Sequence, residues 1–336
     1  MIKAQRLIGL GCGIVAMWMA AGTAFAAEPA KAPVKITIAS FQVGSTWYVY
    51  SVSLGRVLSG VLPKGSTIDT PPIGGGSANT RLVEEGKATL GFSHALANRW
   101  AKDGAVAYDK PMPRLRGLVG GLDVYYLAVI ASGKNVQPDL ANYFKHKPDA
   151  RVDLNPPGSI ATYAGRLELG LAGASPEEIK KRGGSVNLVP ASVIQDDITG
   201  GRADAFVNMI TVGHPLTTQV TQVHDVTFLQ PSKSLLQEMR DKYGFGTAVL
   251  PKGSFRGQDQ DITLPSTVTT LIARDDMPEW LAYDITKAVC EHTEQLVAAT
   301  KALKDFKPEE AWQPANVNLP LHPGAARYYR ERGWLK

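Results

Sequence analysis

Three turns of the sequence place glycine and serine between a predicted strand and a predicted helix. A helix start offers backbone amides that have no partner inside the helix, together with the positive end of the helix dipole. Glycine lets a ligand come close to the backbone, so each turn can bind an anion. The three turns are Gly44-Ser45-Thr46, Gly76-Ser77 followed by Asn79, and Pro157-Gly158-Ser159.

The composition of these turns argues against phosphate and favours a carboxylate. A P-loop needs a lysine and then a serine or threonine after its second glycine, whereas Gly76 is followed by Ser-Ala-Asn. The dinucleotide fingerprint needs a third glycine that "GGGSAN" does not supply. A carboxylate needs only a few amide and hydroxyl donors. Any one turn can equally be a plain helix cap, and the argument for a ligand rests on finding three.

Further polar and aromatic side chains are predicted beside the turns. Ser93 and His94 end the third strand, and Asn208 lies near the end of a later one. His94 is either a surface or capping residue or a donor to an anionic group, and protonation would strengthen that bond. Trp47 and Tyr48 follow the first turn, where Trp47 belongs either to the core or, like Tyr48, to an aromatic wall against a small ligand.

Signatures of enzyme chemistry are absent from the sequence. It contains no G-x-S-x-G, no H-E-x-x-H and no paired cysteine motif. Its six histidines are scattered without metal-ligand spacing, and Cys290 lies at a helical position that fits a buried filler better than a nucleophile. We therefore expect a binding protein with no catalytic residue, no metal and no cofactor.

Strands and helices that alternate along the chain must position these residues. "VKITIASF" alternates as a strand, the apolar face of residues 47–61 predicts a helix, and Gly86 ends a helix that starts near Ser77. The alternation restarts near Leu140, and residues 278–299 predict a helix near the end of the chain. Such alternation predicts mostly parallel sheets covered by helices.

Two extended segments divide these elements into two lobes. "LRGLVGGLDVYYLAVIAS" is long enough to pass from one lobe to the other, and "LPSTVTTLIARDD" can return the chain. We predict an α/β fold of two lobes, each with a mostly parallel sheet flanked by helices, joined by a hinge of two strands. Lobe I comprises residues 27–123 and 271–336, and lobe II comprises residues 124–270.

Residues 1–26 are predicted to be a secretory signal peptide. Lys3 and Arg6 precede an uncharged apolar run that ends in Ala24-Phe25-Ala26. The alternative is an uncleaved membrane anchor, although four glycines dilute the run. Loss of the leader lowers the formal net charge from +5 to +3, and the scattered lysines and arginines form no stripe for nucleic acid.

A series of motifs along the chain points to one family. They are "GSTWYVY", "IGGGSANTRLVEEGKATLGFSHA", "NPPGSIAT", "ITGGRADAFV" with "VGHP" shortly after, "YDITKAV" and "LHPGAARYYRERG". In this order and spacing, the chain resembles the solute-binding subunit of a TAXI-type TRAP transporter over roughly residues 35–333. The resemblance implies a type II periplasmic binding fold whose lobes close on a small organic solute.

The resemblance also assigns ligand-binding residues. The family's first ligand loop corresponds to Gly44, Ser45, Thr46, Trp47 and Tyr48, its glycine loop to Gly76, Ser77 and Asn79, its strand-end pair to Ser93 and His94, its second-lobe loop to Pro157, Gly158 and Ser159, and its Gly-x-Pro turn to Gly213, His214 and Pro215. Where many relatives carry an acid, this chain has His94, which argues against a ligand that presents an ammonium group there.

The family's partners follow from the same resemblance. We expect a periplasmic monomer that binds a small organic anion, a carboxylate or an amino-acid-like solute, and delivers it to the integral membrane subunits of a TRAP transporter. Family members are associated with glutamate, glutamine and other organic acids, and they use an ion gradient without ATP hydrolysis. The alternatives are a subunit of an ATP-driven importer, a sensor that presents solute to a receptor, and an enzyme that has borrowed the fold.

Overall fold

The structure is a computed structural model of the chain, and it describes residues 31–336 except 42, 44 and 135. The predicted leader and Gly44 therefore lie outside the described residues. Residues 33–336 form one compact unit, to which the rest of the description refers. Within the described part of the chain, none of the helices combines the length and the apolar character that a membrane span requires.

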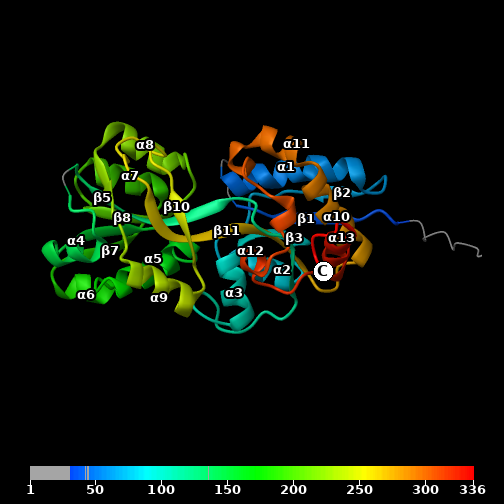
Figure 1. The fold of residues 1–336 in the computed structure, drawn as a ribbon, viewed down its shortest axis with the longest axis horizontal. Helices are drawn as coiled ribbons and strands as arrows, with labels where there is room; N and C mark the ends of the chain where they lie inside the picture. The colour runs from blue at the N-terminus through cyan, green and yellow to red at the C-terminus, as the bar shows by residue number, and fades with distance from the viewer. Residues whose placement is uncertain (1–30, 42, 44, 135) are drawn as a thin grey trace, which may run out of the picture. The chain divides into compact units, whose positions relative to one another are not determined.

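The strands form one sheet that continues from one lobe into the other (Figure 1). Their bounds are β1 Lys35–Ala39, β2 Thr67–Asp69, β3 Leu90–His94, β4 Leu115–Val119, β5 Val124–Ser132, β6 Arg151–Leu154, β7 Ser185–Leu188, β8 Ala205–Ile210, β9 Val226–Phe228, β10 Gly246–Leu250 and β11 Ile262–Arg274.

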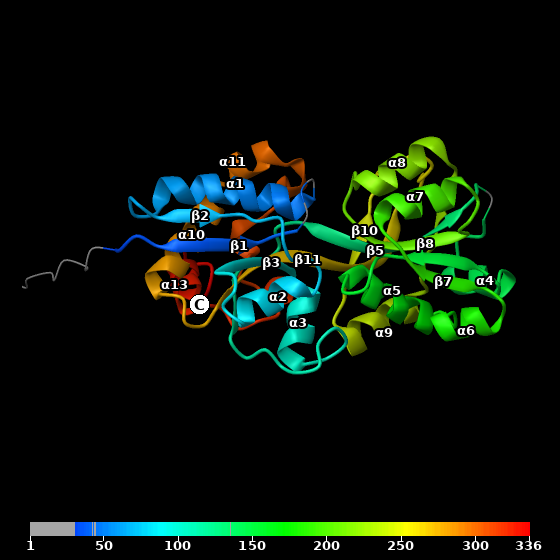
Figure 2. The same cartoon turned by 180° about the vertical axis from the view of Figure 1, so that it is seen from behind.

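Helices cover both faces of this sheet (Figures 1 and 2). Their bounds are α1 Thr46–Val61, α2 Ala78–Glu84, α3 Ala95–Asp103, α4 Leu140–His146, α5 Ile160–Leu171, α6 Pro176–Lys181, α7 Ala191–Thr199, α8 Pro215–Val223, α9 Lys233–Tyr243, α10 Glu279–Glu291, α11 Thr293–Ala299, α12 Pro314–Val317 and α13 Pro323–Glu331, with 3₁₀ turns at Lys301–Leu303 and Pro308–Glu310.

The long strand β11 connects the two lobes. The strand order is β2-β1-β3-β11-β5-β8-β6-β7. The first part of β11 pairs with β10 and β5, up to Val268 opposite Val124, and the rest pairs with β3 and β4, starting at Thr269 opposite His94. The outer strands of each lobe run parallel, as predicted, whereas the crossing strands β5 and β11 run antiparallel to their neighbours.

Three apolar cores support this arrangement. One lies in lobe I, where α1, α10 and α13 pack on the sheet, and another lies in lobe II beneath α7 and α8. The third includes residues of both lobes, among them Trp100 of α3, Leu169 of α5, Met239 of α9 and Phe245. Because burial of apolar surface is the main stabilising term in folding, this shared core holds the lobes together on the side of α2, α3, α5 and α9.

Two predicted elements differ from the structure. The extended segment of residues 115–132 is two strands, β4 and β5, because the chain turns at Gly120-Gly121, where an added Cβ on Gly120 would collide with the backbone of Asn316. The helix predicted over residues 278–299 is interrupted at His292, between α10 and α11. The exact lobe boundaries, residues 27–123 with 271–336 and residues 124–270, stay a prediction.

Candidate functional site

The glycine turn before α2 contacts the serine turn of the other lobe. The amide of Ser77 donates to the carbonyl of Gly158 at 3.1 Å, and the Ser77 hydroxyl points to the same oxygen at 3.3 Å. A guanidinium nitrogen of Arg81 donates to that hydroxyl at 2.8 Å. Here the helix start therefore holds a backbone carbonyl of lobe II, where the sequence predicted an anion. Moreover, α2 has only seven residues, and its dipole is correspondingly small.

All three glycines of this turn are needed for its shape. Gly74, Gly75 and Gly76 have φ values of +87°, +87° and +52°, a region that side chains with a Cβ rarely adopt. An added Cβ would collide with Asn79 at Gly74, with Phe41 at Gly75 and with the carbonyl oxygen of Gly158 at Gly76. The glycines thus allow close packing inside lobe I and between the lobes.

Asn79 fixes the turn to the chain after β1 and to β3, which lead to the predicted ligand residues. Its Oδ1 accepts from the amide of Gly75 at 2.7 Å, and its Nδ2 donates to the carbonyls of Ser40 at 2.7 Å and Phe92 at 2.8 Å. The side chain is fully buried. Asn79 was predicted to bind ligand, but these bonds occupy its amide group, so its role in this structure is to hold the turn.

His94 lies at the point where β11 joins β3, between two aromatic rings. Its ring centroid is 4.7 Å from that of Trp47 and 4.8 Å from that of Tyr125. His94 is 6% exposed, and its Nδ1 has no hydrogen-bond partner among the described residues. Burial lowers the pKa of His94 to about 3. The ring is therefore neutral near pH 7, and any hydrogen bond that it donates to a ligand comes from a neutral N–H.

Replacement of His94 is expected to change how stability depends on pH. The unfolded chain binds a proton near the ordinary pKa of 6.5, which the folded chain binds only near pH 3. The contribution of neutral His94 to the free energy of unfolding is thus complete above pH 6.5 and is lost as pH falls toward 3, by up to about 1.4 kcal/mol per pH unit. Urea unfolding at pH 7, 6 and 5 should show a shallower decline for His94→Phe and His94→Gln than for the wild type. Equal slopes in all three proteins would contradict this.

The turn before α1 is a helix cap with aromatic neighbours. The Ser45 hydroxyl accepts from the amide of Tyr48 at 3.2 Å, and the ring of Trp47 lies 6.5 Å from that of Tyr125 between centroids. Trp47 is 5% exposed and belongs to the core of lobe I, while Tyr48 is half-buried. Ser45, Thr46 and Tyr48 are therefore the residues of this turn that remain partly accessible, and Trp47 takes part through its contact with His94.

The turn before α5 has the donors that a carboxylate needs. Ser159 is half-buried, and its hydroxyl does not cap the helix. The amides of Ile160 and Ala161 have no acceptor within the described part of the chain. Since α5 has twelve residues, its start carries a fuller dipole than that of α2. This turn is the better candidate for binding an anion.

The remaining predicted ligand residues are Ser93, Asn208, Pro157 and Gly213. Ser93 is fully buried beside His94, and Asn208 is buried with its Oδ1 accepting from Nδ2 of Asn155 at 2.9 Å. Pro157 is exposed, and Gly213 is exposed with a φ of +72° in the turn that leads to α8. The structure brings together the Gly76 and Gly158 turns and groups Trp47 with His94, and it shows no such contact for Gly213 among the described residues.

Sequence reasoning missed several residues of this group. Tyr125 and Thr269 lie on the crossing strands and Asn155 precedes the Pro157 turn, and none has a local signature. Thr269 is 222 residues from Trp47, with which it forms a hydrogen bond. The available signal was the long β-branched segment of β11, which predicted a crossing strand and could have suggested that its middle lies beside the site.

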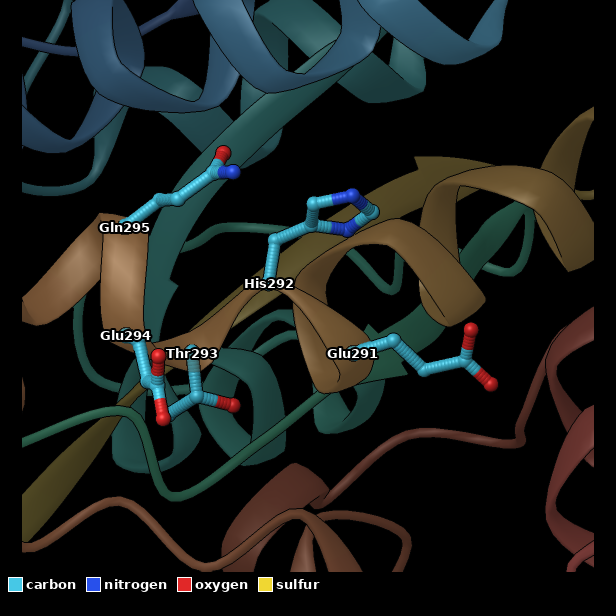
Figure 3. A pocket seen from close by; sticks show the side chains of 5 residues that line it. All are labelled: Glu291, His292, Thr293, Glu294 and Gln295. Carbon is cyan, nitrogen blue, oxygen red and sulfur yellow. The ribbon is translucent and has the colours of Figure 1, made fainter.

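Two hollows in the structure are lined by residues other than the predicted ligand residues. One, of about 330 Å³, is a surface depression lined by five consecutive residues at the junction of α10 and α11, Glu291 to Gln295 (Figure 3). The other is an apolar cavity of about 20 Å³ in the core of lobe I, lined by Tyr50, Leu54, Phe92 and neighbouring apolar side chains. Neither contains a residue that the sequence assigned to a ligand.

Comparisons with known proteins agree on the fold. A model of the NMT1-like family matches residues 38–333. The periplasmic binding protein BugD is similar with a TM-score of 0.54 and 14% identity, over 90% of this chain and 96% of that one. MatC from Rhodopseudomonas palustris with bound malate has a TM-score of 0.53 and 14% identity, over 89% and 98%.

A third similar structure is that of PhnD1 from Prochlorococcus marinus (MIT 9301) in complex with methylphosphonate. It has a TM-score of 0.54 and 9% identity, over 80% of this chain and 90% of that one. At such identities the likeness concerns the fold alone. It confirms the predicted α/β fold of two lobes with the architecture of a periplasmic binding protein.

Proposed function

The chain belongs to the NMT1-like family, and we propose that it is the periplasmic solute-binding subunit of a TAXI-type TRAP transporter. In this proposal it captures a small organic carboxylate between its lobes and delivers it to membrane permease subunits. The order and spacing of the sequence motifs support the transporter class. The observation that carries the binding role is the meeting of the two lobes at turns that begin helices, Ser77 against Gly158.

The chemistry of the site supports a carboxylate. The start of α5 presents the Ser159 hydroxyl beside two amides without a protein acceptor, which suits an oxygen anion. His94 adds a neutral ring between Trp47 and Tyr125, which suits the carbon skeleton of the solute. Malate in MatC, a protein with the same fold, is a carboxylate of the expected size class.

A ligand screen by thermal unfolding tests the binding role. The chain without its predicted leader, residues 27–336, is heated with mono- and dicarboxylates, keto acids, aromatic acids and amino acids, each paired with its uncharged amide. A ligand of the folded state stabilises it by about 2.7 kcal/mol at a hundredfold excess over Kd. We expect at least one acid, but not its amide, to raise Tm by several degrees. A rise with the amides alone would replace the carboxylate by an uncharged solute.

The transporter class requires a second experiment. Membrane vesicles that contain the candidate permease subunits are mixed with the ligand-bound protein. Solute uptake is then measured either with an imposed ion gradient or with ATP. The proposal expects uptake that follows the gradient and is independent of ATP. Uptake that needs ATP would favour the ATP-driven importer, and binding without uptake would favour a sensor.

A further inference from the structure

A buried hydrogen-bonded group joins α1 to both crossing strands. Nε1 of Trp47 donates to Oγ1 of Thr269 at 3.1 Å, and the hydroxyl of Tyr50 donates to Oδ2 of Asp123 at 2.8 Å. The backbone amide of Thr269 donates to the carbonyl of Asp123 at 3.1 Å. All four side chains are more than nine-tenths buried. Two aromatic residues one helical turn apart are thus fixed to one point between β5 and β11.

This point is where β11 changes partners. Val268 is the last residue of β11 that pairs with β5, and Thr269 is the first that pairs with β3, directly opposite His94. Asp123 immediately precedes β5. The hydroxyl of Thr269 therefore lies between the hinge strands and the aromatic group around His94, on a side chain that is fully buried.

The bond from Trp47 to Thr269 limits how the indole can turn. An indole has a single hydrogen-bond donor, so this bond defines which edge of the ring faces the hinge. The indole also packs against His94, with the two ring centroids 4.7 Å apart and the ring planes tilted by 49°. Because Nδ1 of His94 has no protein partner among the described residues, packing against Trp47 and Tyr125 orients the imidazole. A change in the indole angle would therefore move the imidazole as well.

Asp123 holds this junction through its backbone and its side chain. Its carbonyl accepts from the amide of Thr269 at 3.1 Å, and its Oδ2 accepts from the hydroxyl of Tyr50 at 2.8 Å, whereas its Oδ1 has no hydrogen-bond partner among the described residues. Burial raises the pKa of Asp123 to about 6, and the hydrogen bond from Tyr50 opposes this rise. The indole of Trp47 is therefore the side-chain group that is hydrogen-bonded to the Thr269 hydroxyl.

We propose that Thr269 is a positioning residue of the ligand site: its hydroxyl orients Trp47 and thereby the His94 ring that meets the solute. This inference rests on the proposed binding function, because it assigns a role to a residue that does not itself touch the ligand. It also links the ring orientation at the site to the junction of the two hinge strands.

The test uses neighbouring threonines of β11. Thr269→Val removes the hydroxyl and keeps the shape, and Thr269→Ser restores the hydroxyl. Thr270→Val is the matched control, because Thr270 is equally buried on the next residue of the strand but bonds to the carbonyl of Asn316. The Trp47 signal is isolated by subtracting the near-ultraviolet circular dichroism and fluorescence of the Trp47→Phe variant in each background.

We expect the Trp47 signal to change in Thr269→Val, to return in Thr269→Ser and to stay as in the wild type in Thr270→Val. With the acid found in the thermal screen, Thr269→Val should lose about five- to tenfold in affinity, and the other two variants should stay within about twofold. An unchanged Trp47 signal in Thr269→Val would overturn the inference, as would a change of equal size in Thr270→Val.

The spectroscopic measurement needs no ligand, so it separates this inference from the proposed function. A Trp47 signal that depends on Thr269, combined with no response to any acid in the screen, would count against the carboxylate and leave the positioning role of Thr269 in place. A changed signal with unchanged affinity would show that the orientation of Trp47 does not matter for binding, and would overturn the link to the site.

Discussion

Gly76→Ala is expected to separate the turns of the two lobes and to weaken ligand binding by roughly 30- to 100-fold. An added Cβ at this position collides with the carbonyl oxygen of Gly158, the acceptor of the Ser77 amide. Overpacking of this kind costs about 2 to 3 kcal/mol, and the cost applies only when the turns are in contact. A ligand that binds both lobes must overcome it, and each 1.4 kcal/mol is about tenfold in affinity.

A matched control separates this collision from backbone strain. Gly201 also has a positive φ, +66°, but an added Cβ there meets nothing within 4 Å. Gly201→Ala should therefore carry a similar backbone strain of about 1 kcal/mol without affecting the lobes. Small-angle scattering without ligand should show a larger radius of gyration for Gly76→Ala alone, and calorimetry should show its loss of affinity. Equal scattering and equal affinity for the two variants would rule out a role for this contact.

Asn79→Ala is expected to lower the free energy of unfolding by about 3 to 5 kcal/mol. It removes the partners of the Gly75 amide and of the Ser40 and Phe92 carbonyls, all in a buried environment. A buried polar group without a partner costs about 1 to 3 kcal/mol, and here several are created together. The glycine turn would also lose its attachment to Ser40, which follows β1, and to Phe92 in β3.

Asn98→Ala provides the comparison for this variant. Asn98 is equally buried, but its side chain donates to a single carbonyl, that of Val317, and its Oδ1 has no partner among the described residues. We expect this variant to lose about half as much stability as Asn79→Ala in urea unfolding. Equal losses would mean that the additional hydrogen bonds of Asn79 contribute nothing to stability and that the side chain acts only by filling space.

Much of the fold could be predicted because it depends on local patterns. The alternation in residues 34–41 gave β1, and the apolar stripe after Ser45 gave α1 with Ser45 as its cap. The β-branched segment that ends at Arg274 was predicted as a crossing strand and is β11. The helix predicted through His292 was wrong in its continuity, because its apolar pattern does not reveal the break between α10 and α11.

Less of the candidate site could be predicted. The motifs named His94, Trp47 and Ser159, but they did not distinguish a side chain that meets a ligand from one that holds the backbone. Asn79 illustrates the difference: its amide is occupied by Gly75, Ser40 and Phe92, residues that come from three separate segments of the chain. The protonation state of His94 could not be predicted from the sequence either, because it depends on the burial of the ring between Trp47 and Tyr125.

The sequence by itself determined where helices begin, because a glycine or serine at a helix start acts within a few residues. It also determined the α/β alternation and the two crossing segments. Only the tertiary structure decided what each helix start binds. Ser77 and Gly158 are 81 residues apart, and their contact depends on how the lobes pack. For that reason one glycine turn holds a backbone carbonyl, while the amides of Ile160 and Ala161 after Ser159 have no acceptor in the described part of the chain.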